Sequence, residues 1–477
     1  MAWFRTPAAH LAFAASTIAT LFAMLLVAPL PLWSAQPAPL PAAGGPPPEP
    51  AGSIGLIIPA VFALALCLPF RPYVQAQRVL AHKSVSPRAL LATTAVVALA
   101  AFLIYPGYGS DIFDYLGFER MWVVYGDNPL EALPLNHPQD WSSSYVWYPD
   151  RTPAYGPLWA ILTWPVVRAA GDSPAAAVAG YKILSIGAYA ACCWLLWRSV
   201  EPARRQRALV MFAWSPLVLF EVVGKVHNDI LPALSLLAMT WLLTRTRKRA
   251  RKNLSLPALV AGGLVKITAL AAGPAAVVYV WLKTGWRSAV IGAASALLLA
   301  IVCYAPFWDG AAALRPILGQ TSRIVWSPAS LLIVVSGLVP GGPHEVPVRV
   351  LLGLIWAAVC AVTLLRARLE APSDVAATSG WLMLVSLLLL TSAVFAHYLV
   401  PAIALAAVST DERLQRLVMW LSIGALAAYA VELLSLVFGS AWIGSDTYKL
   451  IGTLSLLGPP ALACCVPWRR SRRPVPV

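Results

Sequence analysis

The chain has 477 residues, of which 59% are hydrophobic and only 12% are charged. A soluble globular domain carries about 25% charged residues, and many apolar runs here reach the roughly 17–25 residues that cross a bilayer. A net charge of +15 would suggest nucleic-acid binding in a soluble protein, but most basic residues fall in short loops between apolar runs, where they set orientation. Composition therefore excludes a soluble domain, and we expect a lipid bilayer and no nucleic acid as partner.

We predict an all-α fold: a polytopic transmembrane bundle of about 12–14 helices, with residues 1–477 forming one integral-membrane domain. The first apolar run predicts a helix at about 8–33 whose start lies on the cytoplasmic side. Residues 34–52 hold seven prolines and no basic residue, which predicts an extended external linker. Helices at about 53–70 and 89–105 then flank a basic cytoplasmic loop.

The next segment, residues 106–157, is the predicted catalytic loop on the external face. It carries seven of the twenty acidic residues of the chain, although apolar runs flank it. Asp111, Asp114, Tyr115 and Phe118 are spaced i, i+3, i+4 and i+7, which on a helix places two carboxylates and two rings on one face. We expect membrane-surface helices here and chemistry on sugars. The alternatives are that the two aspartates are solvated carboxylates or cap a helix.

Two later segments are predicted to reach the same external level. The proline-broken run at 155–170 predicts a re-entrant or surface helix, because a crossing there would place the following arginine cluster outside. A helix at 208–226 is predicted to run outward into Gly224–Asp229, which has four polar residues in six. That element is either a polar turn or a functional site at the membrane boundary.

The segment 255–283 predicts a pair of short helices broken around Gly273-Pro274. Lys266 lies near the middle of this apolar stretch, where it either snorkels to an interface or binds a lipid phosphate. His397 follows a further outward helix and is either a satisfied buried histidine or part of the site. The basic end, residues 468–477, predicts a cytoplasmic tail.

This topology brings ionisable groups together at the external face, where such groups mark functional sites. The groups expected to converge there are Asp111, Asp114, Glu119, His227, Asn228, Asp229 and His397. The seven cysteines lie in apolar segments and show no metal-ligand spacing. We expect no cofactor; a divalent metal stays an alternative, but the site has too few obvious ligands for us to assign any.

Several motifs together resemble one family. Ser110–Met121 with Tyr125–Pro129 is similar to the first external loop of the actinobacterial polyprenol-phosphomannose-dependent α-1,6-mannosyltransferases, which are membrane glycosyltransferases of the C superfamily. Arg151–Leu158 resembles the closure of that loop, and Gly224–Asp229 resembles the Gly-x-x-His-Asn-Asp element of the family. Gly262–Lys266 fits its Gly-rich broken helix. The resemblance runs over roughly residues 89–410, and it departs at Asp114, where a small polar residue is more usual, and in the proline-rich linker.

The resemblance implies an inverting transfer of a sugar, usually mannose, from a polyprenyl-phosphate donor to a glycan or glycolipid acceptor on the external face. It implies Asp111 as the base that deprotonates the acceptor hydroxyl. Lys266, with Arg120 or Lys225, is then the candidate cation for the leaving phosphate. The full set of expected substrate-binding residues is Asp114, Tyr115, Glu119, Arg120, Tyr155, Lys225, His227, Asn228, Asp229, Lys266 and His397. The alternative function is a transporter or flippase of lipid-linked sugars. The sequence shows no inverted repeat, which counts against this alternative.

Overall fold

A computed structural model describes residues 6–27, 54–106, 111–245, 252–318, 325–439 and 442–465. Across these residues all regular secondary structure is helical, apart from one isolated bridge between Val325 and Ala393. The prediction of an all-α fold is confirmed. The linker predicted at 34–52 and the tail predicted at 468–477 lie outside the described residues.

The α-helices follow one another along the whole described chain. They are α1 (Pro7–Val27), α2 (Ile54–Cys67), α3 (Phe70–His82), α4 (Pro87–Phe102), α5 (Ile112–Tyr125), α6 (Pro157–Ala170), α7 (Pro174–Ser199), α8 (Arg205–Ala213), α9 (Pro216–Val218), α10 (Ile230–Arg245), α12 (Ser255–Gly263), α13 (Gly273–Thr284), α14 (Trp286–Tyr304), α15 (Arg315–Leu318), α16 (Pro328–Ser336), α17 (Glu345–Arg366), α18 (Pro372–Leu389), α19 (Val400–Val408), α20 (Glu412–Leu433), α21 (Ser435–Phe438) and α22 (Asp446–Cys465). Several short 3-10 segments and one π-helix connect them.

The multi-pass membrane class is also confirmed. Within the described residues, seven helices are long and apolar enough to cross a bilayer, or up to eight if one bent pair counts as a single span. The bent pair joins Arg205–Ala213 to Pro216–Gly224 at 46°. Four shorter apolar helices accompany these spans: Pro7–Ala23, Pro87–Phe102, Ile230–Thr244 and Ala396–Val408.

Local sequence sets the helix ends. α4 and α7 each begin at a Ser-Pro pair, in which the serine hydroxyl accepts a hydrogen bond from the first turn and proline occupies a position that needs no N–H donor. α5 ends at Gly126, whose φ of 78° suits glycine. α6 spans only 14 residues and is not among the candidate spans, as expected for a surface or re-entrant helix.

Three predicted boundaries were wrong. The loop expected after the second helix is helical to His82, because α3 is amphipathic and buries Phe70 and Tyr73 while Arg71 stays exposed. The outward helix predicted at 208–226 is not continuous but bends between α8 and α9. The break expected at Gly273-Pro274 lies earlier, between α12 and Ile267, because Pro274 sits in the first turn of α13, where proline is tolerated.

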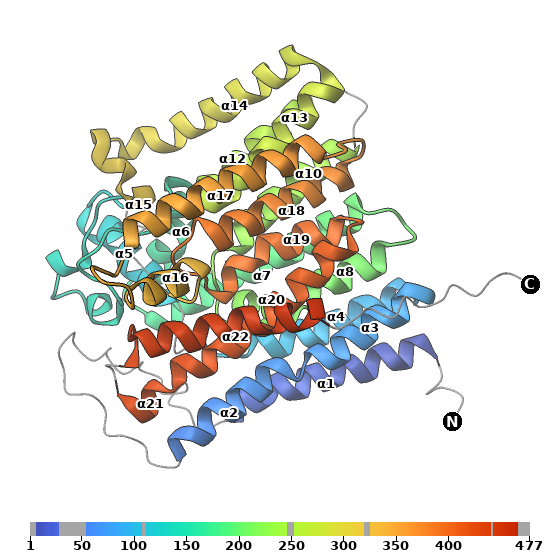
Figure 1. Cartoon of the computed structure of the whole chain (residues 1–477), viewed down its shortest axis with the longest axis horizontal. Helices are drawn as coiled ribbons and strands as arrows, with labels where there is room; N and C mark the ends of the chain where they lie inside the picture. The colour runs from blue at the N-terminus through green and yellow to red at the C-terminus, as the bar shows by residue number, and fades with distance from the viewer. Residues whose placement is uncertain are drawn as a thin grey trace, which may run out of the picture.

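The arrangement of the core helices decides where the polar groups meet. α10 is buried and packs against α7, α12 and α19, whereas α14 and α17 expose large apolar side chains. α14 runs along one edge of the bundle (Figure 1). α5 and α6 gather at one end of the bundle. The chain is irregular just before α10, just before α19 and just after α12. Three polar breaks in neighbouring helices therefore lie close together.

Candidate active site

Asp111 stands immediately before α5 and faces the breaks in the core. Its Oδ2 accepts a hydrogen bond from the Tyr155 hydroxyl at 3.1 Å and from the Tyr115 hydroxyl at 3.5 Å. The hydroxyl of Tyr115 in turn accepts from the backbone N–H of Asn228 at 3.1 Å. Among the described residues the carboxylate makes no capping hydrogen bond to α5. Asp111 therefore occupies the N-cap position of α5 without capping it through its side chain, and two phenols hold its carboxylate instead.

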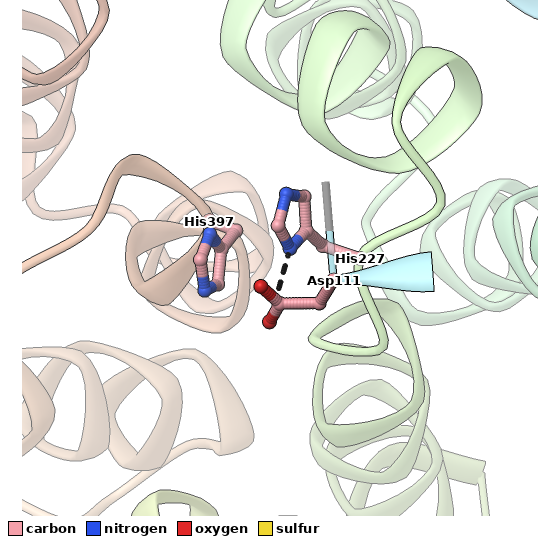
Figure 2. A group of neighbouring side chains, drawn as sticks. All are labelled: Asp111, His227 and His397. Atoms are coloured by element: carbon pink, nitrogen blue, oxygen red, sulfur yellow. Dashed lines mark ion pairs between the residues drawn. The ribbon is translucent and has the colours of Figure 1, made fainter. Parts of the chain in front are cut away.

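The imidazole of His227 lies next to Asp111 on the side that faces the protein core. Its Nδ1 lies 3.7 Å from Asp111 Oδ2, and the side chain of Asp111 is 29% exposed while that of His227 is 1% exposed (Figure 2). Burial acts to raise the pKa of Asp111, but the adjacent His227, with His397 and Lys266 beyond it, holds that pKa well below its usual range. Asp111 is thus an ionised carboxylate, and it is partly exposed whereas His227, His397 and Lys266 are buried.

The backbone that presents His227 is strained and unusual. A π-helix covers Leu219–Gly224, and Val226 adopts a φ of 66°, a region that β-branched residues avoid. Strain of this kind costs about 1–3 kcal/mol and clusters at functional sites. The buried ammonium of Lys182 donates to the carbonyls of Phe102, Ile104 and Gly224 at 2.6, 2.6 and 3.1 Å. Lys182 thereby ties this turn to the end of α4.

His397 lies in a 3-10 segment, Ala396–Leu399, directly before α19, and stacks on His227. The two ring centroids are 3.8 Å apart and the planes differ by 9° (Figure 2). Asp111, His227 and His397 could each offer one metal ligand, within 4.8 Å of one another. Imidazole binds a metal in the plane of its ring, at about 2.0–2.1 Å. An ion in the plane of one ring would lie outside the plane of the other, so this set would need a ring to turn before it could hold a metal.

Lys266 forms a buried ion pair with Asp229. Its Nζ lies 2.8 and 3.1 Å from the two carboxylate oxygens, and the side chains are 3% and 2% exposed. The ammonium also lies 4.1 Å from the centroid of the Tyr398 ring. Lys266 therefore does not snorkel to an interface, and its charge stays inside the protein at the break that follows α12.

The irregular segment after α12 also binds the end of the loop 106–157 through backbone hydrogen bonds. The backbone N–H of Gly156 donates to the carbonyl of Val265 at 3.0 Å, and that of Leu158 donates to Leu264 at 3.1 Å. A side chain at position 156 would collide with the Leu264 carbonyl, so only glycine permits the close approach. The loop and the broken helix are therefore joined through main-chain atoms.

Asp114, Glu119 and Arg120 lie on α5 but face other partners. Asp114 accepts a hydrogen bond from the Trp147 N–H at 2.7 Å and so holds the returning loop. Arg120 makes a bidentate pair with Asp140 and a second pair with Asp172. The two carboxylates expected on one helical face therefore diverge, because the loop folds back over α5.

The pKa values of two acids on and beside α5, Glu119 and Asp140, are shifted in opposite directions. Burial dominates at Glu119. It raises the pKa of Glu119, which is 3% exposed, to about 8, and a hydrogen bond with Thr163 offsets only part of this. At Asp140 burial also acts to raise the pKa, but hydrogen bonds from Arg120 and Ser142 outweigh it and lower the pKa. Glu119 is thus a neutral acid at neutral pH, and Asp140 is an ionised partner of Arg120.

The predicted site residues consequently divide into two groups. Those that the structure gathers around Asp111 are Tyr115, Tyr155, His227, Asn228, Asp229, Lys266 and His397. Those with contacts elsewhere are Asp114, Glu119, Arg120 and Lys225, the last with the Tyr429 hydroxyl at 3.1 Å. Glu221 is not among the predicted site residues, yet its Oε2 lies 3.1 Å from His227 Nε2. An acid inside an apolar run was the available signal.

A multi-pass helical fold with a buried acid–imidazole cluster beneath a structured loop defines an integral-membrane protein with an enzyme-like polar site. Residues 12–283 match a family model described as alpha-(1->6)-mannopyranosyltransferase, N-terminal domain. The match covers more than half of the chain, and the chain belongs to this family of mannosyltransferases. Searches of curated proteins and of solved structures find no match. The resemblance read from the sequence is confirmed, and among the site residues His397 alone lies outside the matched segment.

Proposed function

We propose that the protein transfers mannose from a polyprenyl-phosphate donor to a hydroxyl of a glycan or glycolipid, with inversion at the anomeric carbon. The observation that carries this proposal is the carboxylate of Asp111, held by two phenols and ionised beside His227. Among the side chains that form ion pairs with His227, His397 or Lys266, and these three themselves, that of Asp111 is the most exposed. An acceptor hydroxyl can reach it, while the groups behind it are closed to solvent.

In the proposed reaction the acceptor oxygen attacks the anomeric carbon as the bond from that carbon to the phosphate oxygen breaks. The proton of the hydroxyl passes to Asp111, and the electron pair of the broken bond leaves with the lipid phosphate. Negative charge on the phosphate is favoured by the nearby Lys266 and by the N-terminal ends of α10 and α19, which begin at Ile230 and Val400. Asn228, with both side-chain amide atoms buried and unpaired among the described residues, is proposed to bind a sugar hydroxyl.

The reaction is proposed for the external face, with the segment 106–157 as the catalytic loop of a single domain. Arg204, Arg205 and Arg207 mark the start of α8, which lies at the other end of the bundle from α5 and α6 (Figure 1). Basic residues remain on the cytoplasmic side of membrane proteins. The end that carries Asp111 is then the external one.

The test is transfer of label from radiolabelled polyprenyl-phosphomannose to mannoside acceptors by protein purified in detergent. We expect product with the wild type and, with Asp111→Asn, a loss of at least about 100-fold, the size of a general-base contribution. Asp150→Asn is the matched control, because Asp150 is an exposed acid of the same loop. A fully active Asp111→Asn protein would refute the assigned base. Absence of product from the wild type, with binding of the donor retained, would favour a transporter.

A further inference from the structure

Glu221 is a fully buried acid directly behind His227. It lies in the π-helix Leu219–Gly224 and its side chain is 0% exposed. Its Oε2 lies 3.1 Å from His227 Nε2 and accepts a hydrogen bond from the Tyr429 hydroxyl at 3.1 Å. The backbone carbonyl of Glu221 also accepts from the N–H of His227 at 2.9 Å. One residue thus binds the main chain and contacts the ring of the histidine that faces Asp111.

A buried carboxylate needs a positive partner, since its desolvation is otherwise very costly. In the described chain the ion-pair contacts of Glu221 are with imidazoles: His227 at 3.1 Å and His397 at 3.8 Å. The ammonium of Lys225 donates to the Tyr429 hydroxyl at 3.1 Å and also helps to balance the charge of Glu221. The contacts of the carboxylate with the two imidazoles are the ones that bear on the histidine facing Asp111.

We propose that Glu221 is a positioning residue that acts on Asp111 through His227. This inference rests on the proposed function, in which Asp111 is the base. Nε2 of His227 lies 3.1 Å from Glu221 Oε2 and Nδ1 lies 3.7 Å from Asp111 Oδ2, so one carboxylate stands near each nitrogen of the same imidazole. Neither contact has hydrogen-bond geometry, so the influence of Glu221 on the ring is electrostatic. The stacked ring of His397 keeps His227 from swinging away. Glu221 itself stays out of reach of any substrate.

A purely structural role makes a different prediction. If Glu221 served only to fasten α20 through Tyr429, its loss would lower stability whatever residue stood at position 227. If it acts through His227, its loss is felt only while His227 is present. Non-additivity between the two positions separates these cases.

The experiment is a double-mutant cycle on kcat and KM with Glu221→Gln, His227→Ala and the double variant, in the transfer assay. We expect Glu221→Gln to lower kcat by about 10–100-fold with little change in KM, and the double variant to be no slower than His227→Ala. Glu432→Gln is the matched control: Glu432 is an acid of α20, and it makes no ion pair with either histidine among the described residues. It should stay within about twofold of the wild type.

Independent losses that multiply, or an unchanged kcat in Glu221→Gln, would overturn the inference. Should that variant fail to fold, Tyr429→Phe removes the hydrogen bond that the carboxylate accepts from Tyr429, and we expect a smaller kcat loss that vanishes when His227 is alanine. Solid-state NMR of [15N]histidine gives a readout without activity. The His227 signal, assigned with His227→Ala, should change tautomer or charge state in Glu221→Gln, and an unchanged signal would also count against the proposal. Inactive wild-type protein with a shifted signal would refute only the proposed function.

Discussion

The buried pair of Lys266 and Asp229 permits a prediction whose size follows from the structure. Asp229→Asn keeps the shape of the side chain but removes its charge, and leaves an ammonium that is 3% exposed without its counter-charge. Removing one partner of a buried ion pair costs about 3–5 kcal/mol. The Tyr398 ring, 4.1 Å from the ammonium, offsets about 1 kcal/mol of this. We therefore expect a loss of about 2–4 kcal/mol in the free energy of unfolding.

The assay is equilibrium unfolding in mixed micelles, followed by tryptophan fluorescence, for Asp229→Asn, Lys266→Met and the double variant. The double variant removes both charges, so it should recover at least half of the loss seen with Asp229→Asn. Asp446→Asn is the matched control, because the pair of Asp446 with Lys449 is exposed, and its change should stay within about 0.5 kcal/mol. A loss below about 1 kcal/mol in Asp229→Asn, or strict additivity in the double variant, would refute the reasoning.

Three further predictions concern burial, strain and metals. Because the pKa of Glu119 is raised to about 8, the folded state holds a proton that the unfolded state loses above about pH 4.5; wild-type stability should fall as pH rises from about 4.5 to 8, and a flatter pH curve for Glu119→Gln by thermal unfolding would check it. Val226→Gly removes the strain of a positive φ but also a buried side chain; these opposed effects of about 1–3 kcal/mol each should nearly cancel, so we expect the free energy of unfolding to change by less than about 1 kcal/mol, whereas a large loss would contradict this. Treatment with EDTA should leave the transfer rate within about twofold, because the stacked rings of His227 and His397 cannot both ligate one ion as they stand; recovery of lost activity by added Mn²⁺ would contradict this.

The convergence of the site could be predicted because it depends on topology. Basic loops fix which helix ends share a face, and that places Asp111, His227 and His397 at one level before any side chain is positioned. The same argument predicted α6 as a surface helix. The lengths of the apolar runs and the positions of the charged residues can both be read directly from a sequence.

Side-chain partners within that level could not be predicted in the same way. Asp114 and Arg120 share a helix with Asp111, but the path of the returning loop brings Trp147 to one and Asp140 to the other. The role of Glu221 depends on a π-helix, which shifts the phase of a helical pattern within six residues. Helical periodicity gives no sign of such a shift.

The attachment of the loop at Gly156 has a consequence for how the family can diversify. Because the loop is bound to the broken helix by main-chain atoms, almost any side chain in it can change without loosening that joint. Under the proposed function, new acceptors could be recognised after substitutions elsewhere in the loop, whereas Gly156 must stay glycine to keep this joint closed. The main-chain attachment at Gly156 can therefore stay the same while the surface of the loop changes.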